Sequence, residues 1–273
     1  MKITVLVENS TENPMLGSEH GLSLYIETLN HRILFDAGDS NLFEKNANML
    51  GIDLSLVDIF ILSHGHHDHG GGLNRFIEIN QYAKIYVNQY AFQSHYSKRN
   101  QEFVDISVPF PNNVENRLIL NPGELVIDDE LMLFSRVEGE KYYPSSNKNL
   151  YTNEEHCYVN DDFKHEQNLI IKTNEKYVLV AGCAHHGMLN IIHQASHIVR
   201  QPINVAIGGL HLYSRSTGIS ESEETVKNIG KEIIETGVQL FTCHCTGDLA
   251  YKILEPIMKT NIKYIRTGFI INI

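Results

Sequence analysis

The stretch Ile61-Leu-Ser-His-Gly-His-His-Asp-His-Gly-Gly-Gly72 places four side chains that commonly bind metal ions within six consecutive positions. It directly follows an apolar run over residues 57–62, which is typical of a buried strand. A loop that leaves such a strand can aim several side chains at one point. Imidazole nitrogens with one carboxylate suit zinc, and also manganese or ferrous iron. The sequence therefore predicts a metal site, with these candidate ligands: His64, His66, Asp68 and His69.

Glycines stand on both sides of the candidate ligands, at position 65 and over residues 70–72. Because glycine lacks a Cβ, it lets the backbone turn tightly and approach another group closely. We therefore expect a tight loop that approaches a ligand or an ion closely.

The spacing of the ligands resembles the His-x-His-x-Asp-His signature of the metallo-β-lactamase superfamily. Three further stretches match the order of that family's loops: Ile33-Leu-Phe-Asp-Ala-Gly38, Gly182-Cys-Ala-His-His-Gly187 and Thr242-Cys-His-Cys-Thr-Gly247. The resemblance covers nearly the whole chain. It implies a four-layer αββα sandwich of the α/β (α+β) class, formed as a single domain over residues 1–273.

Further details are similar to one subgroup of that superfamily. They are Glu19-His-Gly-Leu-Ser23, Gly208-Gly-Leu-His-Leu212 and the ending His244-Cys-Thr-Gly247. The subgroup is usually labelled dihydropterin-ribofuranosylaminobenzene-phosphate synthase. The label implies a phosphorylated or pterin-like ligand and does not by itself define the reaction.

Composition favours a soluble cytoplasmic protein. Hydrophobic residues make up 42% of the 273 positions, enough for a large core, and no apolar stretch is long enough for a membrane span. The four cysteines show no disulfide spacing and are expected to be reduced. A net charge of −11 argues against a nucleic-acid partner, because such proteins usually present a basic face. The oligomeric state is not predicted.

Apolar periodicity predicts alternating strands and helices along the chain. Strands are expected over residues 2–8, 22–28, 31–35, 57–62, 84–87, 118–120, 124–127, 131–135, 168–172, 176–181, 204–207, 240–242 and 269–273. Helices are expected over residues 41–50, 73–79, 89–96, 189–199, 222–235 and 248–258, with N-cap chemistry at Ser222.

Two long polar stretches, residues 98–116 and 138–164, are predicted to be irregular. They are either lids or substrate loops, or ordinary surface excursions. Tyr142, Tyr143 and Tyr151 are candidates to line a pocket for a planar ring, or to pack on its rim.

The resemblance implies two metal ions, with zinc preferred and manganese or iron as alternatives. His64 and His66 would bind the first ion, and Asp68 and His69 the second. His185 and His244 follow predicted strands at positions where the resemblance puts later ligands.

Two ligand assignments stay open at this point. Relatives often have a bridging Asp at or next to position 183, where this chain has Cys183, so either that thiol or His185 completes the second site, and His185 is preferred. A further ligand is usually found before the preceding strand, where this chain offers His165 and Glu166. The alternative for these two residues is a solvated loop.

Asp36 and His211 are expected to act beside the metal ligands. Asp36 would hydrogen-bond a ligand histidine or backbone amides and so orient the ligand, or it would only cap a turn. His211 lies in another loop after a strand and is a candidate to contact substrate or transfer a proton, with a structural hydrogen bond as the alternative.

The preferred function is a zinc-dependent hydrolase of a small molecule, with Asp68 and His211 as catalytic residues and a metal-activated water. A metal-containing sensor with little turnover is an alternative, because the bridging Asp is missing. An iron-dependent redox protein is less favoured, since such relatives usually have Glu where His66 stands.

Overall fold

The computed structural model describes residues 1–114 and 116–273 and contains two compact units. The first unit comprises Met1–Gln93, Ile106–Pro122 and Ile265–Ile273, and the second comprises Ser94–Asp105 and Gly123–Tyr264. Each unit contains a seven-stranded sheet. Among the described residues, no helix combines the length and the apolar character needed to cross a membrane.

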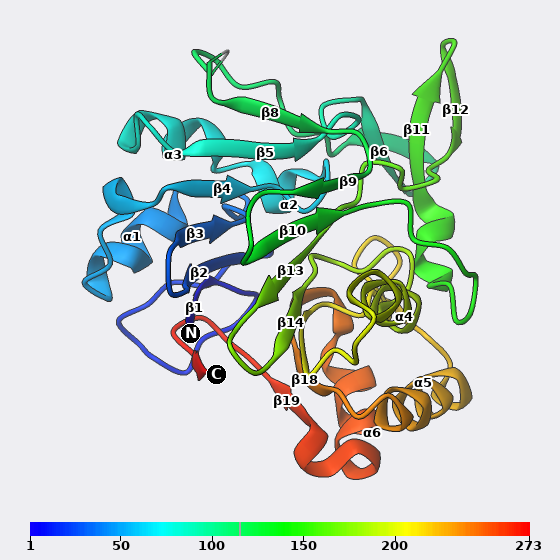
Figure 1. Cartoon of the computed structure of the whole chain (residues 1–273). Helices are drawn as coiled ribbons and strands as arrows, with labels where there is room; N and C mark the ends of the chain where they lie inside the picture. Colours follow the sequence, from blue (N-terminus) through cyan, green and yellow to red (C-terminus); the bar gives the residue numbers. More distant parts are fainter. Residues whose placement is uncertain (115) are drawn as a thin grey trace. The chain divides into compact units, whose positions relative to one another are not determined.

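The sheet of the first unit has the order β20-β1-β2-β3-β4-β5-β8 (Figure 1). Its first four strands are antiparallel, and β3, β4, β5 and β8 are parallel. Strands β2 and β3 form a hairpin, in which Glu27 pairs with Arg32. The strands are β1 (Lys2–Val7), β2 (Ser23–Glu27), β3 (Arg32–Phe35), β4 (Ile59–Ile61), β5 (Lys84–Asn88), β8 (Leu118–Asn121) and β20 (Ile270–Asn272).

Helices α1 (Leu42–Met49) and α3 (Leu73–Ile79) pack on this sheet through their apolar faces. Phe43 of α1, Phe60 of β4 and Phe76 of α3 are fully buried in one cluster, and the rings of Phe60 and Phe76 stack 5.2 Å apart. The described part of this unit also contains the 3-10 helix η1 (Leu54–Leu56) and the single turn α2 (His67–Gly70). The cluster anchors the end of β4, from which the metal-ligand loop leaves.

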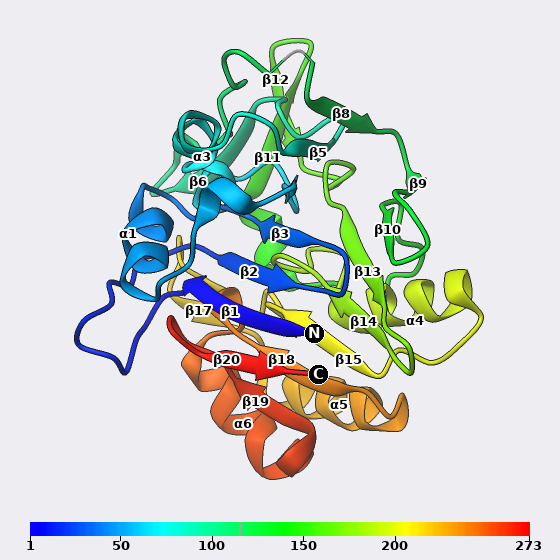
Figure 2. The same ribbon diagram turned by 60° about the vertical axis from the view of Figure 1, so that its left-hand side comes forward.

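The sheet of the second unit has the order β19-β18-β15-β14-β13-β10-β9 (Figure 2). It is antiparallel from β9 to β14 and parallel from β14 to β19. Its strands are β9 (Glu124–Val126), β10 (Leu131–Phe134), β13 (Asn168–Lys172), β14 (Tyr177–Val180), β15 (Val205–Gly208), β18 (Gln239–Thr242) and β19 (Ile262–Tyr264).

Helices α4 (Met188–Val199), α5 (Glu223–Glu235) and α6 (Asp248–Met258) connect the parallel strands of the second unit and pack on its sheet. Ile191, Leu240 and Leu254 are fully buried in their shared core. The predicted cap of α5 is confirmed, since the Ser222 hydroxyl accepts a hydrogen bond from the Thr225 amide. Each unit therefore supplies one helix layer and one sheet layer, as the predicted αββα class requires.

Two predictions of local structure were wrong. The helix expected over residues 89–96 is absent: turns centred on Asn88 lead into β6 (His95–Arg99). This strand pairs with β7 (Glu102–Asp105) and with β11 (Leu150–Glu154), which pairs with β12 (Cys157–Asn160). Both polar stretches predicted to be irregular thus supply strands to one four-stranded sheet, because pairing with a distant segment overrides local propensity.

The glycine loop approaches neighbouring backbone closely. A Cβ at Gly71 or Gly72 would overlap the carbonyl oxygen of Asp39 or Ala37, respectively. None of residues 70–72 has a positive φ, so space and not conformation requires glycine there.

Gly71→Ala is therefore expected to lower the free energy of unfolding by about 1–3 kcal/mol, the usual cost of overpacking a tight contact. Denaturant unfolding measures this. Gly123→Ala is the matched control, because its added Cβ would lie no closer than 3.6 Å to any neighbour. Equal stability of the two variants would contradict the close contact.

Candidate functional site

The loop between β4 and α3 brings the four predicted ligands of the first unit together. His64, His66 and His69 are buried, and the ring of His64 lies 4.6 Å from that of His66 and 4.2 Å from that of His69. Asp68 is partly exposed, with Oδ2 3.9 Å from His69 Nε2. The same carboxylate oxygen lies 3.2 Å from Nε2 of His20. His67 instead pairs with the exposed Asp39.

Asp36 organises this loop from the end of β3. Its Oδ1 accepts from the Ser63 amide at 2.7 Å, and its Oδ2 lies 2.6 Å from His69 Nδ1. The hydrogen bonds predicted for Asp36 are therefore confirmed. The Ser63 hydroxyl donates to Asp36 Oδ2 at 2.7 Å and also lies 2.8 Å from His64 Nδ1.

These contacts determine which ring nitrogen of each histidine carries the proton. A carboxylate only accepts, so His69 donates through Nδ1. The Ser63 hydroxyl gives its one proton to Asp36, so it accepts from His64 Nδ1. Both histidines consequently keep the lone pair on Nε2, the arrangement found when a carboxylate orients a metal-binding imidazole. The donor set of the first unit fits a divalent metal ion.

In the second unit, Cys183 lies at the centre of a cluster of metal-binding side chains. Its Sγ is within 4.8 Å of donor atoms of His185, His211, His244 and Cys245. These side chains come from loops that follow β14, β15 and β18, at the carboxyl ends of parallel strands, where α/β proteins bind ligands. The structure thus brings both open candidates, Cys183 and His185, into the same cluster.

Left-handed backbone conformations recur in these loops. Asp36, Ala184, His211 and His244 have φ values of 58°, 59°, 49° and 53°. Positive φ is uncommon for residues with a Cβ and concentrates at functional sites. Contacts with surrounding residues hold these left-handed turns in place. The turns in their turn set the orientation of the side chains in each loop.

Neighbouring residues hold both the backbone and the ring of His185. The buried Glu166 accepts its amide at 2.6 Å, and Asn147 Nδ2 donates to its carbonyl oxygen at 2.8 Å. The other end of the same amide, Asn147 Oδ1, lies 3.0 Å from His185 Nδ1. Phe163 stacks on the imidazole at 4.3 Å and 6°.

The Asn147 contacts imply a tautomer for His185. The backbone carbonyl oxygen of His185 can only accept a hydrogen bond. The Asn147 side-chain amide must therefore present Nδ2 to that oxygen and Oδ1 to the His185 ring. Because Oδ1 also only accepts, His185 Nδ1 carries the proton and Nε2 keeps the lone pair. His185 thus has the same tautomer as His64 and His69, which supports it over Cys183 as the ligand.

His165 and Glu166 are both 1% exposed, so the alternative of a solvated loop was wrong. Glu166 accepts from the amides of His185 and His186 and lies 2.7 Å from His186 Nδ1. Burial raises the pKa of Glu166, but the His186 hydrogen bond and charge bring it below its usual value. Glu166 therefore stabilises the histidine turn as a carboxylate.

Three residues of this region were missed at the level of sequence: His95, Asn147 and Asp161. His95 fell within the helix wrongly predicted over residues 89–96, and Asn147 lies in a polar stretch, in the 3-10 helix η2 (Ser145–Asn149). Asp161 stands four positions before His165, and this spacing was the one local signal available.

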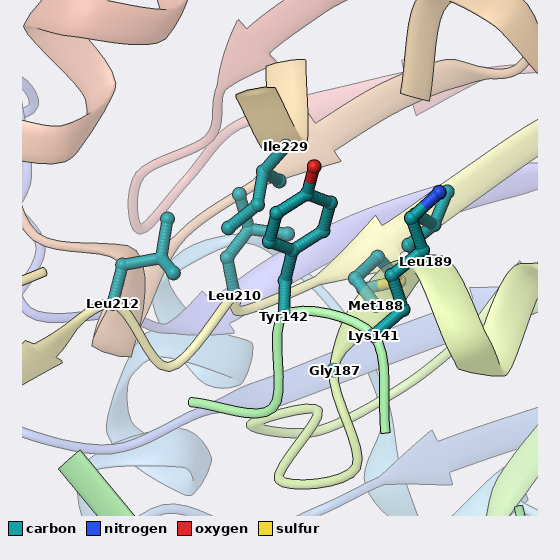
Figure 3. Close-up of a pocket in the computed structure, with 8 residues that line it drawn as sticks. All are labelled: Lys141, Tyr142, Gly187, Met188, Leu189, Leu210, Leu212 and Ile229. Atoms are coloured by element: carbon teal, nitrogen blue, oxygen red, sulfur yellow. The ribbon is translucent and has the colours of Figure 1, made fainter. Parts of the chain in front are cut away.

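The candidate pocket tyrosines differ in their surroundings. Tyr142 lines a small, mainly apolar hollow, shown in Figure 3 with Gly187, Leu210 and Leu212. Its hydroxyl donates to Glu232 at 2.7 Å. Tyr143 is 40% exposed, and burial of its hydroxyl raises its pKa to about 12. Tyr151 packs edge-on against Phe103.

Comparison with known proteins agrees with this geometry. Residues 16–193 match the family model described as the metallo-beta-lactamase superfamily. The chain belongs to this superfamily. The predicted metallo-β-lactamase fold and the α/β class are thereby confirmed. In this superfamily, the His and Asp cluster indicates divalent metal binding.

Several relatives align over nearly the whole length of both chains. One from Methanocaldococcus jannaschii, named 7,8-dihydropterin-6-methyl-4-(beta-D-ribofuranosyl)-aminobenzene-5'-phosphate synthase, is 28% identical and covers 99% of this chain and 96% of its own. An uncharacterised protein of the same organism is 27% identical, covering 99% and 100%. The crystal structure of Tm1679, described as a metal-dependent hydrolase of the beta-lactamase superfamily, has a TM-score of 0.83 at 27% identity and covers 100% and 99%.

Replacing Asn147 by alanine is expected to weaken metal binding about 10- to 100-fold, the usual effect of removing a group that orients a ligand. The variant loses the amide that fixes the His185 ring, and chelator competition measures the affinity.

Ser146→Ala is the matched control, since it removes a hydrogen bond from the same helix to a backbone oxygen, that of His211. If both variants keep wild-type affinity, Asn147 does not orient a ligand.

Proposed function

We propose that the protein is a metal-dependent hydrolase that acts on a small phosphorylated or pterin-like molecule. The metal ligands in this proposal are His64, His66, Asp68, His69, His185 and His244. The observation that carries it is the anchoring of His64 and His69 on Asp36 and Ser63, which leaves Nε2 of each ring with its lone pair. The substrate class is inferred from the name of the Methanocaldococcus relative.

A divalent metal such as zinc, when bound, lowers the pKa of a water and polarises a carbonyl or phosphoryl oxygen. Asp68 is the partly exposed carboxylate of the loop, so it would accept a hydrogen bond from the attacking water and orient it. His211 would pass a proton to the leaving group. Its ring lies 4.2 Å from that of His185, and its backbone oxygen is held by Ser146 at 2.6 Å.

One experiment tests the proposal directly. Protein purified without added metal is analysed for its elements and then assayed, metal-replete, on phosphodiesters, lactones, thioesters and pterin phosphates. We expect about two zinc ions per chain and turnover on one class, lost on chelation and restored by zinc. The His66→Ala variant serves as a control that should lack both full metal content and activity.

A second candidate function is a metal-containing sensor with little turnover. It is favoured by Cys183, which stands where relatives often have a bridging carboxylate and lies within 4.8 Å of several other donors. Substoichiometric metal and no turnover on any substrate class would support the sensor and contradict the hydrolase. Bound iron in place of zinc would instead favour redox chemistry.

A further inference from the structure

A short hairpin follows His211 directly in the second unit. Its strands are β16 (Tyr213–Ser214) and β17 (Ile219–Ser220), and residues 215–218 connect them. The proposed function gives His211 a proton to transfer but assigns no role to this hairpin. Because the hairpin continues the chain from a residue of the proposed site, its turn can contact a part of the substrate that does not react.

Three contacts hold the base of the hairpin. The Leu212 carbonyl oxygen accepts a hydrogen bond from the Glu221 amide at 2.7 Å, which closes the hairpin. The Leu212 side chain is buried and lines the apolar hollow of Figure 3. A Cβ at Gly247 would lie 2.6 Å from Cβ of Tyr213, so β16 packs closely against the end of the 3-10 helix η3 (His244–Thr246). The hairpin is therefore held beside a proposed metal ligand.

The turn of this hairpin carries the one basic side chain of the loops that follow β14, β15 and β18. These loops comprise residues 181–187, 209–222 and 243–247, in which Arg215 is the single lysine or arginine. Arg215 is exposed and forms no ion pair within the part of the chain that the structure describes. The one carboxylate of its loop, Glu221, instead accepts from the Ser145 amide at 3.0 Å. Arg215 is thus available to an anionic ligand.

Hydroxyl groups flank this arginine. The Oγ atoms of Ser214 and Ser216 lie 3.0 Å apart, so one hydroxyl donates to the other. Each hydroxyl has one proton, and the accepting hydroxyl therefore keeps its own proton for a further partner. A guanidinium group can donate two parallel hydrogen bonds to the oxygens of a phosphate. The donors of this turn therefore suit a phosphate group.

We infer that Arg215, with the hydroxyls of its turn, binds a phosphate group of the substrate that lies outside the reacting bond. This inference rests on the proposed function, in which the substrate is phosphorylated. Arg215 is four positions after His211, a separation of at most about 14 Å along an extended chain. A phosphomonoester of moderate size can therefore contact both residues, and Arg215 selects it over its dephosphorylated form.

Phenylphosphonate is the probe for this site, because it has the charge of a phosphomonoester and its carbon–phosphorus bond resists hydrolysis. Calorimetry gives its dissociation constant for the zinc-loaded wild-type protein and for Arg215→Gln, which removes the charge. We expect the variant to bind about 10- to 100-fold more weakly, the usual effect of losing a hydrogen bond to a charged group. Arg215→Lys restores the charge without the two parallel donors, so it should recover part of the affinity.

Arg200→Gln is the matched control. This arginine is also exposed, but it follows the last residue of α4, at the end of the helix away from the loop after β14. Its substitution should leave the dissociation constant unchanged. The inference would be overturned by a wild-type protein that does not bind phenylphosphonate, by wild-type affinity in Arg215→Gln, or by equal losses in the two glutamine variants.

Failure of this inference can be told apart from failure of the proposed function. Binding of phenylphosphonate that depends on Arg215, in a protein that hydrolyses none of the tested substrates, would support the phosphate site and contradict only the hydrolase. Turnover of a phosphorylated substrate with the same KM in the wild-type protein and in Arg215→Gln would support the hydrolase and contradict the phosphate site. Denaturant unfolding should be unchanged in Arg215→Gln, because the side chain is exposed.

Discussion

Asp68→Asn is expected to lower turnover about 10²- to 10⁴-fold, the range associated with removing a positioned acid or base. Asparagine keeps the volume of the side chain but removes its charge, so it neither binds a metal ion as a carboxylate nor accepts strongly from the attacking water. The side chain is 21% exposed, so the free energy of unfolding should change by less than about 1 kcal/mol. Turnover on the substrate found by screening and denaturant unfolding measure the two effects.

Asp39→Asn is the matched control. This carboxylate lies in the loop after β3, is exposed and pairs with His67, outside the cluster of buried histidines. It should leave turnover nearly unchanged. Normal turnover in Asp68→Asn would remove Asp68 from the mechanism, whereas equal losses in both variants would indicate a general effect of charge near the loop.

The parts of the fold and of the site that depend on residues close together in the sequence were predictable. The ligand loop after β4 is a local motif, and its strand, its glycines and the following helix α3 agree with the pattern of residues 57–79. Helix α6 was predicted with its observed bounds, because apolar spacing and a following break in that spacing are both local signals.

The missed parts depend on contacts between distant segments. Tyr96 of β6 pairs with Tyr151 of β11, which lies more than fifty positions later, and neither segment alternates in a way that marks a strand. For the same reason Asn147 was not recognised: its partner His185 is 38 positions away. Buried polar contacts between distant residues produce no periodic pattern of residue types in the sequence.

The choice between Cys183 and His185 shows where three-dimensional structure adds to the sequence. Proximity alone does not separate them, since their donor atoms lie within 4.8 Å of each other. Their hydrogen bonds differ, and they favour His185 as the proposed ligand. The Asn147 amide and the Glu166 carboxylate orient His185 and leave the lone pair on Nε2. At Cys183, the backbone carbonyl oxygen accepts a hydrogen bond from Cys245 Sγ at 3.4 Å.

His185→Ala is accordingly expected to lose metal and nearly all activity, whereas Cys183→Ser should stay largely active. Alanine removes a neutral nitrogen ligand and leaves an incomplete coordination shell. Serine keeps the size of cysteine but is a poor zinc ligand, so it tests the thiol without opening a cavity. Metal content by elemental analysis, chelator competition and turnover on the identified substrate measure the difference.

His186→Ala is the control for the histidine turn, because it removes the neighbouring imidazole and its contact with Glu166 while keeping His185. It should retain metal even if its stability falls. The reverse pattern, with metal lost in Cys183→Ser and kept in His185→Ala, would make the thiolate the ligand. In that case the tautomer fixed by Asn147 serves packing alone, and a metal-loaded crystal structure would show Cys183 Sγ, not His185 Nε2, at bonding distance from the ion.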